Sequence, residues 1–127
     1  SVVQTCALPI SGSKSALGAG NQAVLGFVDL QPGESIEIQK AALLKPDGSP
    51  VSSTITLEIV TFDGAGGYTS QSTLITGDGA TVFDDQTGSP LGSYSNSGTA
   101  EETAGVLINN SGTAGEDVYG EAKGEVA

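Results

Sequence analysis

Apolar and polar residues alternate with a period of two along most of this chain, which is the pattern of a half-buried β-strand. The clearest example is STITLEIVTF (53–62). Its aliphatic side chains share one face and its polar side chains share the other: Ile55, Leu57 and Ile59 against Thr54, Thr56 and Glu58. Similar patterns predict the following strands: 2–10, 22–30, 35–44, 53–62, 68–76, 80–83, 103–109 and 117–127.

The segments between these strands are rich in turn residues. Pro32-Gly33 and Asp47-Gly48 supply the backbone angles of tight turns. QAVLGFVDL (22–30) is apolar enough to predict a buried strand, and in 117–127 the small residues Gly120, Ala122 and Gly124 fall with Val126 on one face. About eight or nine short strands without a convincing helix predict an all-β fold, an antiparallel β-sandwich with the jelly roll as one version.

Two segments interrupt the alternation. SGSKSALGAGN (11–21) has few large apolar residues and is expected to be a flexible connector, so residues 1–21 would form an N-terminal strand or arm with its connector, and 22–127 a single sandwich domain. Residues 84–98 have no period beyond Leu91 and Tyr94 and predict a long surface excursion. The pentapeptide NSGTA occurs at 96–100 and 110–114, which predicts two similar turns that lead into similar strands.

The net charge of the chain limits the kinds of partner that it can be expected to bind. Fifteen carboxylates face four lysines, arginine and histidine are absent, and the formal net charge is −11. Nucleic acids and anionic membranes are bound through clustered Lys and Arg, so neither is an expected partner. A surface of one charge sign repels itself, and molar salt screens that repulsion. The composition therefore indicates a protein adapted to high salt.

The candidate chemistry is sparse. Without histidine the chain lacks the usual base of serine and cysteine triads and the common zinc ligand. Adjacent carboxylates occur at 84–85, 101–102 and 116–117, but neighbours in a strand face opposite sides, and the aromatic platform of a glycosidase is missing. Cys6 stands alone among apolar residues and is expected to be a buried small hydrophobe. We expect no enzyme activity and no cofactor.

The acidic stretch ITGDGATVFDDQTGSP (75–90) allows two interpretations. It lacks the alternating acids and terminal Glu of a calcium loop, which favours hairpin ends on an acidic surface. The alternative is a structural cation held by Asp78, Asp84 and Asp85. Asn109 heads a formal glycosylation triplet, NNS, which would matter only in an exported chain.

The strands FVDLQPGESIEI (27–38) and STITLEIVTF, the turns rich in Gly, Ser and Thr, and the free N-terminal arm resemble small β-sandwich proteins that coat viral capsids or build tails. With its acidic composition, the whole chain resembles a capsid decoration protein of a tailed virus of haloarchaea. The resemblance implies a location in the virion, a symmetric homo-oligomer, commonly a trimer, and a major capsid protein or other virion protein as partner.

Residues that would make such contacts can be named. An edge strand can add to the sheet of a neighbour through main-chain hydrogen bonds, which points to the arm residues Val2, Val3, Gln4 and Thr5. Leu91 and Tyr94 are the candidates for a contact from the 84–98 segment. The alternative function is an exported surface-layer or adhesive β-sandwich of a halophile, extracellular and with a cation as one option.

Overall fold

The computed structural model describes residues 6–77, 82–84 and 89–127. Within these ranges the chain forms β-strands and no helix, so no helix has the length and hydropathy of a membrane span. In chain order the strands are β1 (Cys6–Leu17), β2 (Gln22–Leu30), β3 (Ser35–Leu44), β4 (Ile55–Phe62), β5 (Tyr68–Thr76), β6 (Val82–Asp84), β7 (Gly92–Ser95), β8 (Glu102–Asn110) and β9 (Glu116–Val126). The all-β prediction is confirmed.

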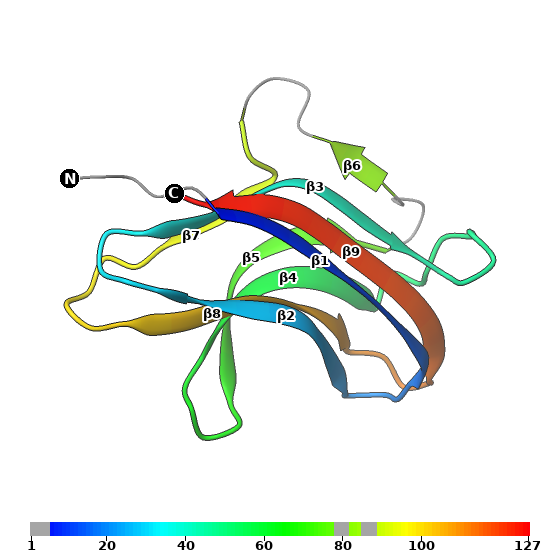
Figure 1. The fold of residues 1–127 in the computed structure, drawn as a ribbon. Helices are drawn as coiled ribbons and strands as arrows, with labels where there is room; N and C mark the ends of the chain where they lie inside the picture. The colour runs from blue at the N-terminus through cyan, green and yellow to red at the C-terminus, as the bar shows by residue number, and fades with distance from the viewer. Residues whose placement is uncertain (1–5, 78–81, 85–88) are drawn as a thin grey trace.

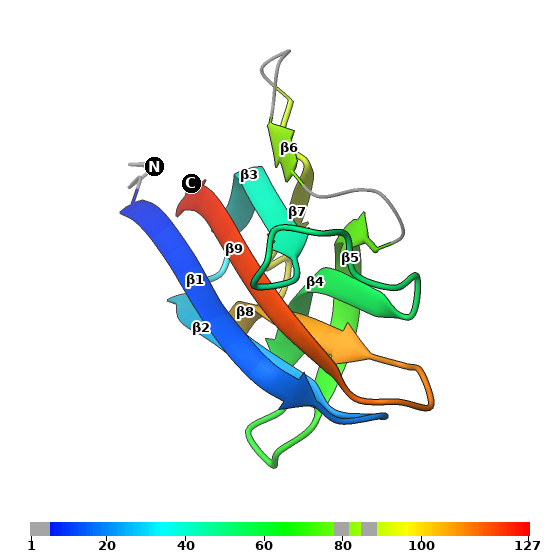
Figure 2. The same cartoon turned by 90° about the vertical axis from the view of Figure 1, so that its right-hand side faces the viewer.

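The strands form two antiparallel sheets packed face to face (Figures 1 and 2). Sheet A has the order β1-β9-β3. Both β6 and β7 pair with β3 along the edge that faces away from β9. Sheet B has the order β2-β8-β4-β5. The predicted antiparallel sandwich is therefore confirmed.

The pairing is nested along the chain. β1 pairs with β9, β2 with β8, β3 with β7 and β4 with β5, and successive pairs alternate between the two sheets. A long antiparallel ribbon rolled in this way is a jelly roll. The short β6 is an additional strand beside β3. The topology thus selects the jelly roll among the sandwiches that the sequence allowed.

The core lies between the sheets and matches the alternation of the sequence. Ile55, Leu57 and Ile59 of β4 are fully buried, as predicted. In β9 the predicted inner face is also confirmed, and its small residues make room for the opposite sheet. A Cβ on Gly120 would lie 2.9 Å from Cδ1 of Ile108 in β8. Close packing across the core thus depends on small residues in one sheet facing large ones in the other.

The segment expected as a flexible connector is largely strand. β1 continues to Leu17, and its residues from Ser11 to Lys14 pair with Val118 to Glu121 of β9. A register shift then brings Leu17, which is buried, opposite Glu116. Main-chain hydrogen bonds to a neighbouring strand form regardless of side-chain hydrophobicity, so the weak apolar pattern of this segment did not prevent pairing.

The segment expected as a surface excursion also contains a strand. β7 pairs four residues of 84–98 with β3, from Ser35 opposite Ser95 to Ile38 opposite Gly92. Strands this short leave too few alternations for a period to be read, which is why the sequence pattern missed it.

The two NSGTA segments adopt the same structure, as the repeat predicted. Asn96 is fully buried, and its Nδ2 donates to the carbonyl oxygens of Leu30 (3.0 Å) and Ala100 (2.8 Å). Its Oδ1 accepts from the amide of Gly98 at 3.0 Å, and its carbonyl accepts from the amide of Gly33 at 2.8 Å. One side chain therefore fixes its own loop and ties it to the turn after β2.

Asn110 repeats this arrangement at the other end of β2. Its Nδ2 donates to the carbonyl oxygens of Leu17 and Ala114, both at 2.9 Å, and its Oδ1 accepts from the amide of Gly112 at 2.9 Å. Its carbonyl accepts from the amide of Gly20 at 2.8 Å. We call these two arrangements the asparagine clasps. They join the loops on either side of β2 to the loops on either side of β8.

Replacing Gly124 by alanine is expected to lower the free energy of unfolding by about 1–3 kcal/mol. A Cβ there would lie 2.0 Å from the carbonyl oxygen of Glu37, so β9 and β3 would have to separate. Gly115→Ala is the matched control, because the nearest atom to its Cβ would be 3.6 Å away. Urea denaturation measures the free energy of unfolding of both variants. Equal stabilities for Gly124→Ala and Gly115→Ala would contradict the close approach of β9 and β3 at Gly124.

Candidate interaction surface

The outer face of sheet B is built from rows of side chains that the strand register places side by side. Because the alternate residues Ala104, Val106 and Ile108 face the core, the residues beside them in β8 face outward, namely Thr103, Gly105, Leu107 and Asn109. Across β2, β8 and β4 the rows are Gln22–Asn109–Thr56, Val24–Leu107–Glu58, Phe27–Gly105–Val60 and Asp29–Thr103–Phe62. The middle of this face is apolar.

Two large apolar side chains of this face are open to solvent. Phe27 is 69% exposed and Val24 is 51% exposed. The ring of Phe27 meets that of Phe62 edge to face, with 6.5 Å between centroids. Gly105 lies beneath them, since a Cβ there would be 2.8 Å from Cε2 of Phe62 and 3.1 Å from Cβ of Phe27. We call Val24, Phe27, Phe62 and Thr103, which line one shallow depression, the aromatic patch.

Polar side chains flank the patch at both ends and form hydrogen bonds with one another. At one end Gln22 Nε2 donates to Asn109 Oδ1 at 2.9 Å. At the other end Thr103 Oγ1 donates to Asp29 Oδ1 at 2.7 Å. An apolar centre with a polar rim is the arrangement of many protein–protein interfaces.

The rim at the Thr103 end is acidic. Asp29 and Glu101 are exposed there, and exposed Asp63 follows Phe62 in the loop between β4 and β5. The Asp63 carboxylate accepts hydrogen bonds from the amides of Ala65 (2.8 Å) and Gly67 (2.9 Å), and these bonds lower its pKa. It therefore stays ionised at neutral pH.

Glu58 lies on the same face but is only 7% exposed. Its carboxylate accepts hydrogen bonds from the hydroxyls of Thr56 (2.7 Å) and Ser70 (2.5 Å). A buried carboxylate requires such partners, and here they join β4 to β5. Glu58 therefore supports the sheet beside the aromatic patch.

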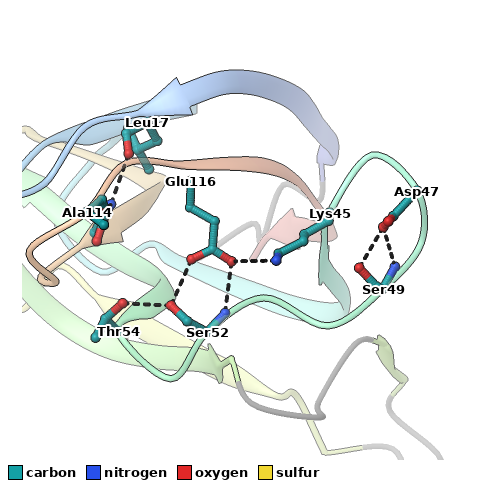
Figure 3. Close-up of polar contacts among 9 residues, drawn as sticks. Leu17, Lys45, Asp47, Ser49, Ser52, Thr54, Ala114 and Glu116 are labelled. Atoms are coloured by element: carbon teal, nitrogen blue, oxygen red, sulfur yellow. Dashed lines mark hydrogen bonds and ion pairs between the residues drawn. The ribbon is translucent and has the colours of Figure 1, made fainter.

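Within each described pair of adjacent carboxylates, the two side chains accept hydrogen bonds from different partners. Glu116 accepts from the amide of Ser52 (3.0 Å) and from its hydroxyl (2.8 Å), and lies 3.7 Å from Lys45 Nζ (Figure 3). Its neighbour Asp117 accepts instead from the amide of Ala16 in β1. In the other described pair, Glu101 accepts from Gln31 and Glu102 from the hydroxyl of Tyr94. These carboxylates connect strands and loops.

The predicted cation site lies mostly outside the described residues. Asp78 and Asp85 fall outside them, and Asp84 ends β6, where it pairs with Lys40 across the strands. In the part of the chain that the structure does describe, no three His, Cys, Asp or Glu side chains are grouped to hold a metal ion. The cation at 78, 84 and 85 stays a prediction.

The predicted contact residues are placed as follows. The arm residues Val2, Val3, Gln4 and Thr5 lie outside the described residues. Leu91 and Tyr94 are half-buried and pack against the core, and the Tyr94 hydroxyl donates to Glu102 at 2.8 Å, which joins sheet A to sheet B. A contact with another protein through either residue stays a prediction.

Sequence reasoning missed the aromatic patch because of a bulge in β2. The register shifts between Val24 and Gly26, so Val24 and Phe27, three residues apart, share the outer face. Strict alternation would have placed them on opposite faces. The run 22–30 was expected to be buried, but β2 lies at the edge of sheet B and its outer face is open. The one available signal was its apolar character on both faces.

Neither the family models nor the curated proteins contain a match to this chain. Among solved structures, the chain is similar to a chain of the structure of infectious bursal disease virus, Gt strain, with 10% identity and a TM-score of 0.39. The match covers 98% of this chain and 32% of that one. A likeness at this level does not establish a shared function.

Proposed function

We propose that this protein is a structural virion protein that coats or stabilises a capsid through protein–protein contacts. The observation that carries the proposal is the aromatic patch, an exposed apolar surface with a hydrogen-bonded polar rim on a two-sheet jelly roll. Jelly rolls serve in viral capsids, lectins and cupins, so the topology alone does not choose among these functions.

Features of the surface favour the structural role over the other two. Cupin chemistry relies on imidazole metal ligands, and the chain has no histidine. A sugar platform needs an open aromatic face with free hydrogen-bonding groups beside it. Here the rings of Phe27 and Phe62 meet at 76°. At the ends of the patch the Gln22 amide already donates to Asn109, and the Thr103 hydroxyl already donates to the Asp29 carboxylate.

The finer parts of the proposal are a decoration protein, a homo-oligomer of which a trimer is the commonest form, and a halophilic archaeal virus. They are supported by the resemblance of the strands and turns and by the net charge of −11. Subunits with this charge need salt to screen their repulsion when they associate.

The test is the mass by light scattering in about 3 M and about 0.1 M salt, which changes the screening length several-fold. We expect a discrete closed oligomer at high salt and dissociation or unfolding at low salt. Deleting residues 1–5 is the matched variant, because β1 begins at Cys6 and keeps its pairing with β9. It should give a folded monomer if the arm makes the contact. A folded monomer of the full chain in both salts would contradict the oligomer.

A further inference from the structure

We propose that the aromatic patch binds a second protein that presents apolar side chains flanked by Lys or Arg, rather than a second copy of this chain. The inference deepens the proposed function by giving the chemistry of the partner. It rests on that function only for the idea that the partner belongs to the same particle.

The first argument is the local charge. No lysine occurs in the four strands of sheet B, whereas Lys14, Lys40 and Lys123 lie in strands of sheet A and Lys45 follows β3. The exposed ionisable groups beside the patch are the carboxylates of Asp29, Asp63 and Glu101, all at the Thr103 end. A complementary partner is therefore basic on one side of its apolar contact.

The second argument is that this chain does not offer such a surface itself. It has four lysines and no arginine. On the outer face of sheet A, Lys123 of β9 lies opposite Lys40 of β3. Glu121, Glu125 and Glu37 flank these two lysines, and a second copy would bring these carboxylates toward the acidic rim. Like charges placed together across an interface disfavour the wrong partner.

The third argument is the shape of the patch. The side chains of Phe27 and Val24 project from the edge strand β2. Gly105 of the neighbouring strand has no side chain that would fill the space between Phe27 and Phe62. With Phe62 and Thr103, Phe27 and Val24 line a shallow apolar depression between the two polar ends, which is open to apolar side chains of a partner.

The probes are three synthetic peptides: alternating Phe and Lys, alternating Phe and Glu, and alternating Ser and Lys. Binding to the full chain is followed by amide chemical shifts in NMR spectra. We expect the Phe–Lys peptide to shift the amides of Val24, Phe27 and Thr103 and to bind about tenfold or more tightly than either other peptide. Phe27→Ser should lose this binding by a similar factor, and Asp29→Asn should weaken it several-fold.

Tyr119→Ser is the matched control, since Tyr119 is a half-buried aromatic on the other sheet, and it should bind as the natural chain does. Equal binding of the Ser–Lys peptide, equal binding of the Phe–Glu peptide, or unchanged binding by Phe27→Ser would each overturn the proposal. A dimer that Phe27→Ser dissociates would make a second copy the occupant.

These outcomes are separable from those of the proposed function. A monomer in both salts with Phe–Lys binding at the patch would contradict the oligomeric virion protein and leave the partner surface standing. A salt-dependent oligomer without binding of the Phe–Lys peptide would support the oligomeric virion protein and overturn the partner surface. Thermal unfolding of Phe27→Ser shows whether the variant is folded, and the exposure of Phe27 predicts little change.

Discussion

Replacing Asn110 by alanine is expected to lower the free energy of unfolding by about 3 kcal/mol or more. The side chain makes three hydrogen bonds, to the carbonyls of Leu17 and Ala114 and from the amide of Gly112, and it is fully buried. Alanine would leave these main-chain groups without their partner. Urea denaturation, with the midpoint and slope fitted together, measures the loss.

The second clasp gives an internal check on this result. Asn96→Ala removes the same three bonds at the other end of β2 and should cost the same within about 1 kcal/mol. The two losses should add in the double variant, because sites so far apart along the strand are independent. Strongly unequal losses would mean that the repeated sequence has different roles in its two copies.

An aspartate at the same position separates hydrogen bonding from packing. Asn110→Asp keeps the shape but turns a carboxylate oxygen toward the carbonyls of Leu17 and Ala114, which repel it. It should be less stable than Asn110→Ala at pH 7 and recover part of the loss in acid, where the protonated carboxyl can donate one bond. Two variants with the same pH dependence would contradict the donor role of Nδ2.

Replacing Ile59 by alanine is expected to cost about 2–5 kcal/mol of stability. Ile59 is fully buried in β4, and its Cδ1 would lie 3.5 Å from a Cβ on Gly92 of β7, so it fills the space between the two sheets. Its loss would leave a cavity at the junction of sheet A and sheet B. The measurement is again urea denaturation, compared with thermal unfolding.

Phe27→Ser is the matched comparison for that prediction. It removes a larger apolar side chain, but one that is 69% exposed, so the cost should stay below about 1 kcal/mol. The contrast tests the division of the sheets into an inner and an outer face. A large loss on Phe27→Ser would show that the aromatic patch is part of the structural core, and its availability to a partner would then be in doubt.

The alternation of apolar and polar residues in this sequence was sufficient to predict most of the strands. β2, β3 and β5 begin and end where the pattern placed them, and the inner faces of β4 and β9 follow it. In β4 and β9 the predicted inner face is buried, so their alternation could be recognised from the local sequence. The net charge and the absence of histidine also follow from the composition, and the expectation of no enzyme activity rests on them.

The tertiary structure alone decided where pairing overrides local pattern. β1 runs to Leu17 because β9 supplies its main-chain partners, and β7 is a strand because β3 lies beside it. The bulge after Val24 turns Phe27 to the outer face, and the edge position of β2 leaves that face open. Both effects depend on neighbours distant in sequence. A local period therefore could not reveal the surface on which the proposed partner binding rests.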